Sequence, residues 1–293
     1  MKTKNIFIIV AMVPLILSSC FRDELYDRPA PGPEPKPEPE PEPIAQTIAV
    51  TADWSGISQE TTVPEFYNIV LGDRVLSVSE ATTVIDGPFA PGQYDLLLHN
   101  VPAGFTVTGD EARVNSAHAE GEIEPMPGYL FSGRKSDLII EKDGSAEVTV
   151  KMKQHVRGLN IELTVVSGDH SRIVSATASL SGIESGINHR THERSSLPAV
   201  VSGTYNKDGN RLALSYNLLG VVYSAGPRLV TILTFSDGVT QSVESDLSES
   251  LRSFHDDVAP LTLKASLSVP DKAGLKATIT DWKEIDGGNV DAN

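Results

Sequence analysis

Cysteine is almost absent from this sequence, since Cys20 is the only one among 293 residues. No disulfide framework can therefore stabilise the fold. Lysine and arginine number 24 against 39 acidic residues, and the net charge of −15 argues against binding to nucleic acid. Aromatic residues make up only 6% of the chain and do not cluster, so no aromatic platform for a ligand is evident. Helical periodicity is nearly absent as well, which favours a protein built from strands.

The first residues have the pattern of an export signal. Lys2 and Lys4 give a short positive segment, and residues 6–17 form an apolar run of about twelve residues. A run of that length suits a signal peptide and is too short to cross a bilayer. We therefore expect residues 1–19 to be removed during export.

The apolar run ends in four residues that read as a lipobox: Leu17, Ser18, Ser19 and Cys20. Small residues directly before a cysteine are what lipoprotein signal peptidase recognises, and the thiol receives the diacylglycerol before the cut. An ordinary secretory signal with an incidental cysteine is the alternative. The single thiol of the chain stands at the one position where lipid chemistry would use it, so we predict a mature chain that begins at Cys20, lipidated and carrying palmitate-type acyl chains.

Two features after Cys20 indicate where the lipid holds the protein. Asp23 and Glu24 form an acidic cluster that resembles the surface-export signal of Bacteroidetes lipoproteins, with retention on the periplasmic leaflet as the alternative. Residues 29–43 alternate proline with mostly glutamate, which favours an extended polyproline II rod of roughly 45 Å. We expect residues 20–44 to be a spacer that lifts a folded body off the outer face of the outer membrane.

The remaining residues, 45–293, repeat one pattern, in which a short apolar or β-branched run is followed by glycine, asparagine, aspartate or proline. The predicted strands are 48–54, 65–71, 75–78, 94–99, 136–141, 147–153, 159–166, 174–180, 212–219, 228–235, 239–243, 261–269 and 275–282. Residues 136–153 and 228–243 each read as a hairpin around an Asp-Gly turn, and only residues 247–254 fit a short helix. The pattern predicts an all-β chain of two tandem antiparallel β-sandwiches, residues 45–154 and 155–293.

Candidate chemical groups are few. His189, His192 and Glu193 stand close together and could hold a metal weakly, but they do not form the zincin pattern, and a solvated loop is the simpler interpretation. Residues 167–170, Ser-Gly-Asp-His, read as a turn, because a catalytic triad is defined in space and not in sequence. The acid pairs 110–111 and 256–257 have no partner visible in the sequence. We therefore predict no enzyme activity, no cofactor, no metal and no small-molecule substrate.

Four short segments carry a resemblance to a known family. They are the segment SCFRDELYD around Cys20, the junction at residues 148–163, Leu-Ser-Gly-Ile at 180–183, and the ending at 279–292. In these segments the chain resembles the fimbrillin-like lipoproteins of Bacteroidetes, and among them the anchor or minor subunits of the FimB kind in type V fimbriae. The Pro-Glu spacer is longer than expected for that family.

The resemblance implies two transthyretin-like, Greek-key sandwich domains and assembly by strand exchange, in which an extended segment of one subunit completes the sheet of the next. It also implies that an anchor keeps its lipid and donates its C-terminal strand. In this sequence the candidate donor spans residues 275–290, with Leu275, Ala277 and Ile279 on one face and Asp281 interrupting that face. A plain closing strand of the second sandwich is the alternative.

Two functions follow from these patterns. The first is an anchor or accessory subunit of a surface fimbria, acting in pilus assembly and adhesion, with the outer membrane and other fimbrial subunits as partners. The second is a surface glycan- or protein-binding lipoprotein of a nutrient-uptake system, which the scarcity of aromatic residues disfavours. Anchor and tip subunits share the lipobox, so a new N-terminus after Arg28, Lys36 or a later basic residue would indicate a shaft or tip component.

Overall fold

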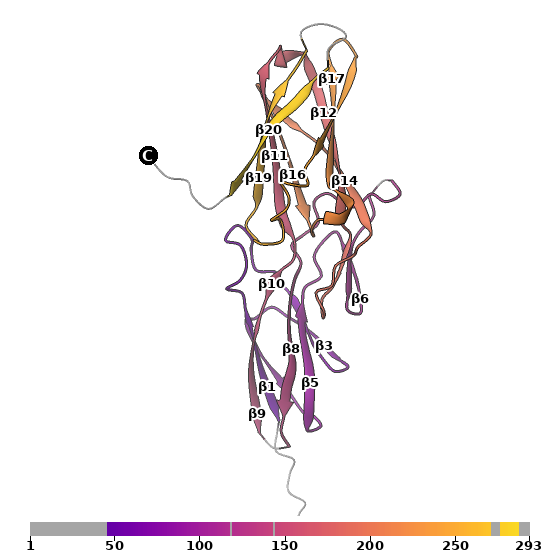
Figure 1. The fold of residues 1–293 in the computed structure, drawn as a ribbon. Coiled ribbons are helices and arrows are strands. Elements are labelled where there is room, and N and C mark those ends of the chain that lie inside the picture. The colour runs from indigo at the N-terminus through magenta and orange to yellow at the C-terminus, as the bar shows by residue number, and fades with distance from the viewer. Residues whose placement is uncertain (1–45, 118, 143, 271–275, 287–293) are drawn as a thin grey trace, which may run out of the picture. The chain divides into compact units, whose positions relative to one another are not determined.

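A computed structural model describes residues 46–117, 119–142, 144–270 and 276–286, which belong to one compact unit of residues 44–293. The described chain is all-β (Figure 1). Its helical pieces are two single 3₁₀ turns, η1 (His170–Arg172) and η2 (Tyr223–Ala225). Among these residues no helix is long and apolar enough to cross a membrane. The lipobox, Asp23, Glu24, the spacer at 29–43 and Leu275 lie outside the described residues.

Two sheets enclose a first hydrophobic core. One sheet has the order β4 (Thr82–Asp86), β1 (Thr47–Asp53), β9 (Ser145–Lys151). The other has the order β10 (Lys153–Gln154), β8 (Phe131–Ile140), β5 (Gly92–His99), β2 (Tyr67–Leu71), β3 (Arg74–Val78). Alternate residues of β1 and β2 are buried, as a strand with one face on a core requires. Trp54 packs edge-on against Tyr67 and Phe131 in this core, with ring centroids 5.6 and 5.5 Å away.

Two further sheets enclose a second and larger core. One sheet has the order β15 (Asn206–Asp208), β16 (Arg211–Leu218), β11 (Arg157–Ser167), β19 (Leu261–Ser268), β20 (Thr278–Asp286). The other has the order β14 (Pro198–Thr204), β12 (Ile173–Glu184), β17 (Arg228–Phe235), β18 (Thr240–Asp246). Each fully buried leucine, isoleucine or valine in these strands contributes about 1.5–3 kcal/mol by leaving water.

A small third sheet ties distant parts of the chain together, with the order β13 (Gly186–Asn188), β7 (Glu111–Val114), β6 (Phe105–Thr108). The segment after β7 also bonds to β14, because the N–H of Ile123 donates to the carbonyl of Val200 at 2.9 Å. Phe105, Val114 and Ile123 belong to the second core although they precede residue 154. The division of the chain at residue 154 therefore stays an interpretation.

The strand pairing is mostly antiparallel, as expected, with two parallel pairs, β1–β9 and β11–β19. The hairpin predicted at 228–243 is confirmed by the antiparallel pairing of β17 with β18. The hairpin predicted at 136–153 is wrong, because β8 pairs with β5 and β10 while β9 pairs with β1 in the opposite sheet. Residues 247–254 form successive turns and no regular helix, with a single i to i−4 bond from Leu251 to Leu247.

Candidate functional site

The segment after β13 is the best-supported site among the described residues. The sequence suggested a solvated loop here, and that interpretation is wrong for its first histidine, since His189 is 0% exposed. Thr191 and Glu193 face solvent, whereas His192 is half-buried. The loop is therefore buried on the side of His189 and exposed on the side of Thr191 and Glu193. The residues that contact the loop explain this arrangement.

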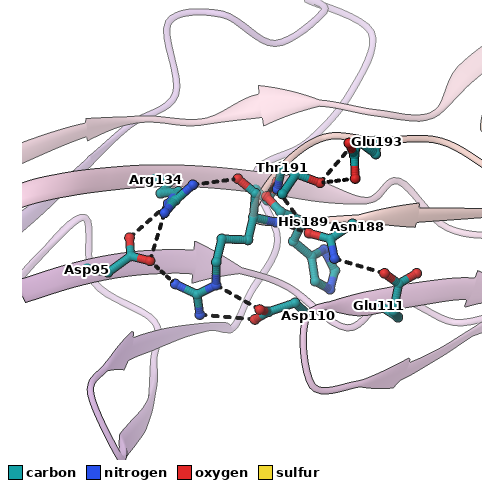
Figure 2. A network of polar contacts seen from close by, with 10 residues as sticks. Asp95, Asp110, Glu111, Arg134, Asn188, His189, Thr191 and Glu193 are labelled. Carbon is teal, nitrogen blue, oxygen red and sulfur yellow. Dashed lines mark hydrogen bonds and ion pairs between the residues drawn. The ribbon is translucent and has the colours of Figure 1, made fainter.

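Arg190 anchors this loop by charge-assisted hydrogen bonds. Its guanidinium donates to both carboxylate oxygens of Asp110, from Nε at 2.7 Å and from Nη2 at 3.0 Å, and Nη1 donates to Asp95. Arg134 donates to the two oxygens of Asp95 at 2.8 and 3.0 Å, and to the carbonyl of Arg190 at 3.2 Å (Figure 2). Fork-to-fork pairing of this kind fixes orientation as well as supplying energy.

This ion network joins residues from four places in the chain. Asp95 lies on β5, Arg134 on β8, Asp110 in the turn between β6 and β7, and Arg190 in the segment after β13. Hydrogen bonding from Arg134 holds the pKa of Asp95 below its usual range, and Arg190 does the same for the pKa of Asp110. The side chains are 25–39% exposed, so solvent weakens each pair, and the value of the network lies mainly in fixing the loop.

Asn188 fixes the turn that presents Arg190. Its Oδ1 accepts hydrogen bonds from the N–H groups of Arg190 and Thr191, both at 2.9 Å, and its Nδ2 donates to Glu111 at 2.8 Å. Figure 2 shows Asn188 between Glu111 and the loop backbone. The acid pair 110–111, which had no visible partner in the sequence, thus holds Arg190 with one carboxylate and Asn188 with the other.

Four of the seven histidines gather beside this network. His99 and His189 are stacked, with ring centroids 4.7 Å apart, and His155 and His192 are 5.0 Å apart. Nε2 of His155 lies 2.7 Å from the Ser132 hydroxyl, and Nε2 of His192 lies 3.4 Å from it. Both ring nitrogens of His189 and Nδ1 of His155 are buried without a hydrogen-bond partner among the described residues.

Burial makes these histidines hard to protonate. It lowers the pKa of His189 to about 4, where the neighbouring His99 adds to the effect and Asp110 opposes it. Burial, reinforced by nearby His192 and Arg194, also places the pKa of His155 well below its ordinary value. The imidazoles are therefore neutral at pH 7, and their protonation would work against the folded state.

The chemistry open to this cluster is limited. Within the described residues no group of three or more histidine, cysteine or acidic side chains could hold a metal ion, so the weak metal site considered for His189, His192 and Glu193 has no support. Ser132 and His155 resemble the first two members of a triad, but Ser132 is 0% exposed and cannot meet a substrate. The arrangement is suited to holding strands together.

The candidate donor strand occupies the edge of its own sheet. Among the strands that the structure describes, β20 pairs only with β19, in an antiparallel arrangement with Ile279 opposite Leu267. Ala277 is buried, and Ile279 is half-buried against the second core. Asp281 has a left-handed φ of 59° and lies beside a register shift in the pairing with β19. Alternation along the strand from Ala277 and Ile279 would place residue 281 inward. Because of the shift, Trp282 takes that inward position and packs against the second core.

Two further sequence patterns have structural explanations. Residues 167–170 form a turn, as predicted, in which Asp169 caps η1 by accepting from the N–H of Ser171 at 2.9 Å. In the pair 256–257, Asp257 accepts from the N–H of Ala259 at 3.2 Å and lies 3.9 Å from Arg157. Neither place combines accessible reactive groups.

Sequence reasoning missed most of the network. Asp95, Arg134 and Arg190 are far apart in the chain and form no motif, so only the folded sheets bring them together. The unusual signals available were the acid pair at 110–111 and the polar run at 189–193. Each was visible, but nothing in the sequence connected them.

The strand order and the edge position of β20 can now be set beside known proteins. The family model of fimbrillin-A associated anchor proteins Mfa1 and Mfa2 matches residues 80–287, more than half of the chain. The chain belongs to this family. The resemblance to fimbrial anchor subunits is thereby confirmed, and membership places the protein in a fimbrial anchor class that works with other fimbrial subunits at the cell surface.

Several solved structures are similar in fold to this member of the anchor-protein family. A candidate adhesin from Bacteroides ovatus has a TM-score of 0.58 at 14% identity, covering 80% of this chain and 92% of that one. The fimbrial anchor protein Mfa2 from Porphyromonas gingivalis has a TM-score of 0.55 at 9% identity, covering 82% and 97%. A candidate polysaccharide-binding protein from Bacteroides thetaiotaomicron has a TM-score of 0.55 at 9% identity, covering 82% and 98%. A comparison with the curated proteins found no match to this chain.

Proposed function

We propose that this protein is the anchor or an accessory subunit of a surface fimbria, held in the outer membrane by a lipid on Cys20 and joined to the next subunit by strand exchange. Membership of the anchor-protein family carries the proposal. The role is mechanical and not enzymatic. The lipobox, the acidic residues Asp23 and Glu24 and the proline-rich spacer support a fixed N-terminal end.

The position of β1 supports an N-terminal strand that is kept. β1 is the central strand of its sheet, paired with β9 along its whole length and with β4 along most of it. A pull on the chain before Thr47 would have to shear two ladders at once, and the buried Ile48 and Val50 would have to leave the core. This is the arrangement expected of a load-bearing end.

The position of β20 supports a C-terminal strand that is exchanged. An edge strand has one neighbour, and its loss uncovers a row of backbone donors and acceptors on β19 that another strand can satisfy. The buried Ala277 and half-buried Ile279 are the side chains that would set the register in a neighbouring subunit. In the isolated chain the same strand closes its own sheet.

The test of the anchor role is the chemistry at Cys20. We expect mass spectrometry of assembled fimbriae to find a diacylglycerol-modified Cys20 at the N-terminus of this protein. In cells that carry Cys20→Ser, fimbriae should still polymerise but should be recovered from the medium. Ser19→Ala keeps a small residue before the cysteine and serves as the matched control, with fimbriae retained on the cells.

Two results would overturn the anchor role. One is a mature N-terminus after Arg28 or Lys36, which would make the chain a shaft or tip component. The other is a deletion strain whose intact fimbriae remain attached to the cells.

A further inference from the structure

A groove of about 820 Å³ lies over the outer face of the sheet that contains β14, β12 and β17. Residues 177–179 of β12, residues 202–204 of β14 and Ile232 of β17 line it on the side of the sheet. Facing them are Glu122, Glu124, Pro125 and Met126, from the segment that follows β7. The volume is in the range of protein sites that bind ligands.

β14 is an edge strand, and part of its free edge is already occupied by the chain itself. The N–H of Tyr205 donates to the carbonyl of Ala176 at 2.9 Å, so the odd-numbered residues at this end of β14 bond to β12 and the even-numbered ones point away from it. At Val200 the outward groups are used, because its N–H donates to the carbonyl of Gly121 at 3.0 Å and its carbonyl accepts from the N–H of Ile123 at 2.9 Å. This is a single pair of parallel strand bonds.

The pairing stops one step further along the edge, where the groove begins. The N–H of Glu124 donates to the carbonyl of Asn115 at 3.0 Å, and Pro125 has no N–H to donate. The outward N–H and C=O groups of Ser202 and Thr204 therefore have no backbone partner among the described residues. Two donors and two acceptors remain beside the groove, and an added strand could bond to them.

The side chains of the groove indicate the charge of such a strand. Glu122 and Glu124 are half-buried, and neither carboxylate forms an ion pair or hydrogen bond with a residue that the structure describes. No lysine or arginine is among the described residues that line the groove. Met126 and Ile232 add apolar surface, 54% and 42% exposed. Carboxylates two residues apart complement cations at alternate positions of an extended chain.

We propose that this groove binds an extended segment of a partner polypeptide, with lysine or arginine at alternate positions, as a strand added to β14. Backbone hydrogen bonds to Ser202 and Thr204 hold the segment, and Glu122 and Glu124 select its charge. The site uses β14 and not β20, so the interaction is independent of the proposed exchange of the C-terminal strand. A negative result here leaves that proposal unchanged.

The first experiment titrates a dye-labelled peptide, Thr-Lys-Val-Lys-Val-Thr-amide, with the full chain in detergent and follows fluorescence anisotropy. We expect saturable binding of one peptide per chain, and at least a tenfold weaker affinity when Glu122→Gln is combined with Glu124→Gln. Glu141→Gln with Glu147→Gln is the matched control, because it removes the same charge from exposed residues outside the groove. It should change the affinity less than twofold.

Two further measurements separate strand addition from attraction of charge alone. With the peptide bound, hydrogen exchange at the amides of Ser202 and Thr204 should slow at least tenfold, while the amides of β18, the other edge of the sheet, keep their rates. A peptide methylated on its four central backbone nitrogens keeps both lysines and should bind at least tenfold more weakly. Three results would overturn the proposal: unchanged exchange at Ser202 and Thr204, equal affinity of the methylated peptide, or equal losses in the groove and control variants.

Discussion

At the scale of single residues, the histidines show what burial does to a titratable side chain. His189 lies against His99 with both ring nitrogens buried and unpartnered among the described residues. Burial therefore favours the neutral form of this ring, with its pKa lowered to about 4. A histidine of this kind contributes to stability at neutral pH only by packing, and it becomes a liability in acid.

Acid should therefore destabilise the protein in a window that His189 helps to define. Its pKa is about 4 when folded and about 6.5 when unfolded, so between these values the unfolded chain binds the extra proton. Stability is at its full value above about pH 6.5 and falls as the pH is lowered toward 4. We expect the Tm to decrease over this range, and His189→Phe to make the decrease shallower while keeping the stack on His99.

The control for this prediction is His170→Phe, because His170 is exposed on η1. It should leave the pH dependence of the Tm unchanged. Asp95 and Asp110 also have lowered pKa values, but their effect is expected below about pH 3.9, outside the window. An identical slope in His189→Phe and in the unmodified chain would contradict the assignment.

At the scale of strands, the sequence predicted which residues form strands better than which strands pair. Residues 136–141 and 147–153 alternate apolar and polar residues around an Asp-Gly turn, and a hairpin requires the same pattern. In the structure Leu138 of β8 and Val148 of β9 belong to one core but to opposite sheets. Alternation reports that one face of a strand is buried, and it does not distinguish a neighbour beside the strand from a neighbour across the core.

The close approach of β8 to β9 across the core is clearest at Gly133 on β8. A Cβ at this position would lie 2.7 Å from the backbone carbonyl oxygen of Lys151 and 2.8 Å from Cγ1 of Val150, so the strands must move apart. We expect Gly133→Ala to lower the free energy of unfolding by about 1–3 kcal/mol, measured by urea denaturation. Gly158→Ala on β11 is the control, since its nearest neighbour is the Pro260 side chain at 3.3 Å. Equal losses in the two variants would show that the close approach at Gly133 is not a constraint.

The candidate site was still harder to predict than the pairing. Asp95, Arg134 and Arg190 of the ion network come from segments that meet only after the sheets have formed, and no spacing rule links them. In the sequence, His99 and His155 stand near the ends of predicted strands, and nothing there distinguishes them from other strand-end residues. The family, in contrast, was recognisable from short contiguous segments of the sequence, which can be read without knowing how the chain folds.

At the scale of the whole molecule, the two ends of the described chain are held differently. β1 is paired on both sides, whereas β20 is paired on one side and is interrupted by the left-handed Asp281. In the proposed anchor the first strand is the fixed end and the last strand is the mobile connection. This asymmetry gives strand exchange a specific requirement, which is that β20 must be able to leave β19.

A disulfide across β19 and β20 tests this requirement. Ser268 and Thr278 are register partners, and neither is buried, so Ser268→Cys with Thr278→Cys should form a disulfide in the oxidising compartment with little cost to folding. We expect the locked protein to reach the membrane with normal stability and to be missing from the boiling-resistant ladders of fimbrial subunits. The single variants Ser268→Cys and Thr278→Cys carry the same changes without the lock, and they should assemble normally. If the fully cross-linked protein still enters the ladders, β20 is only the closing strand of its own sheet, and the connection to the next subunit must be made by another edge.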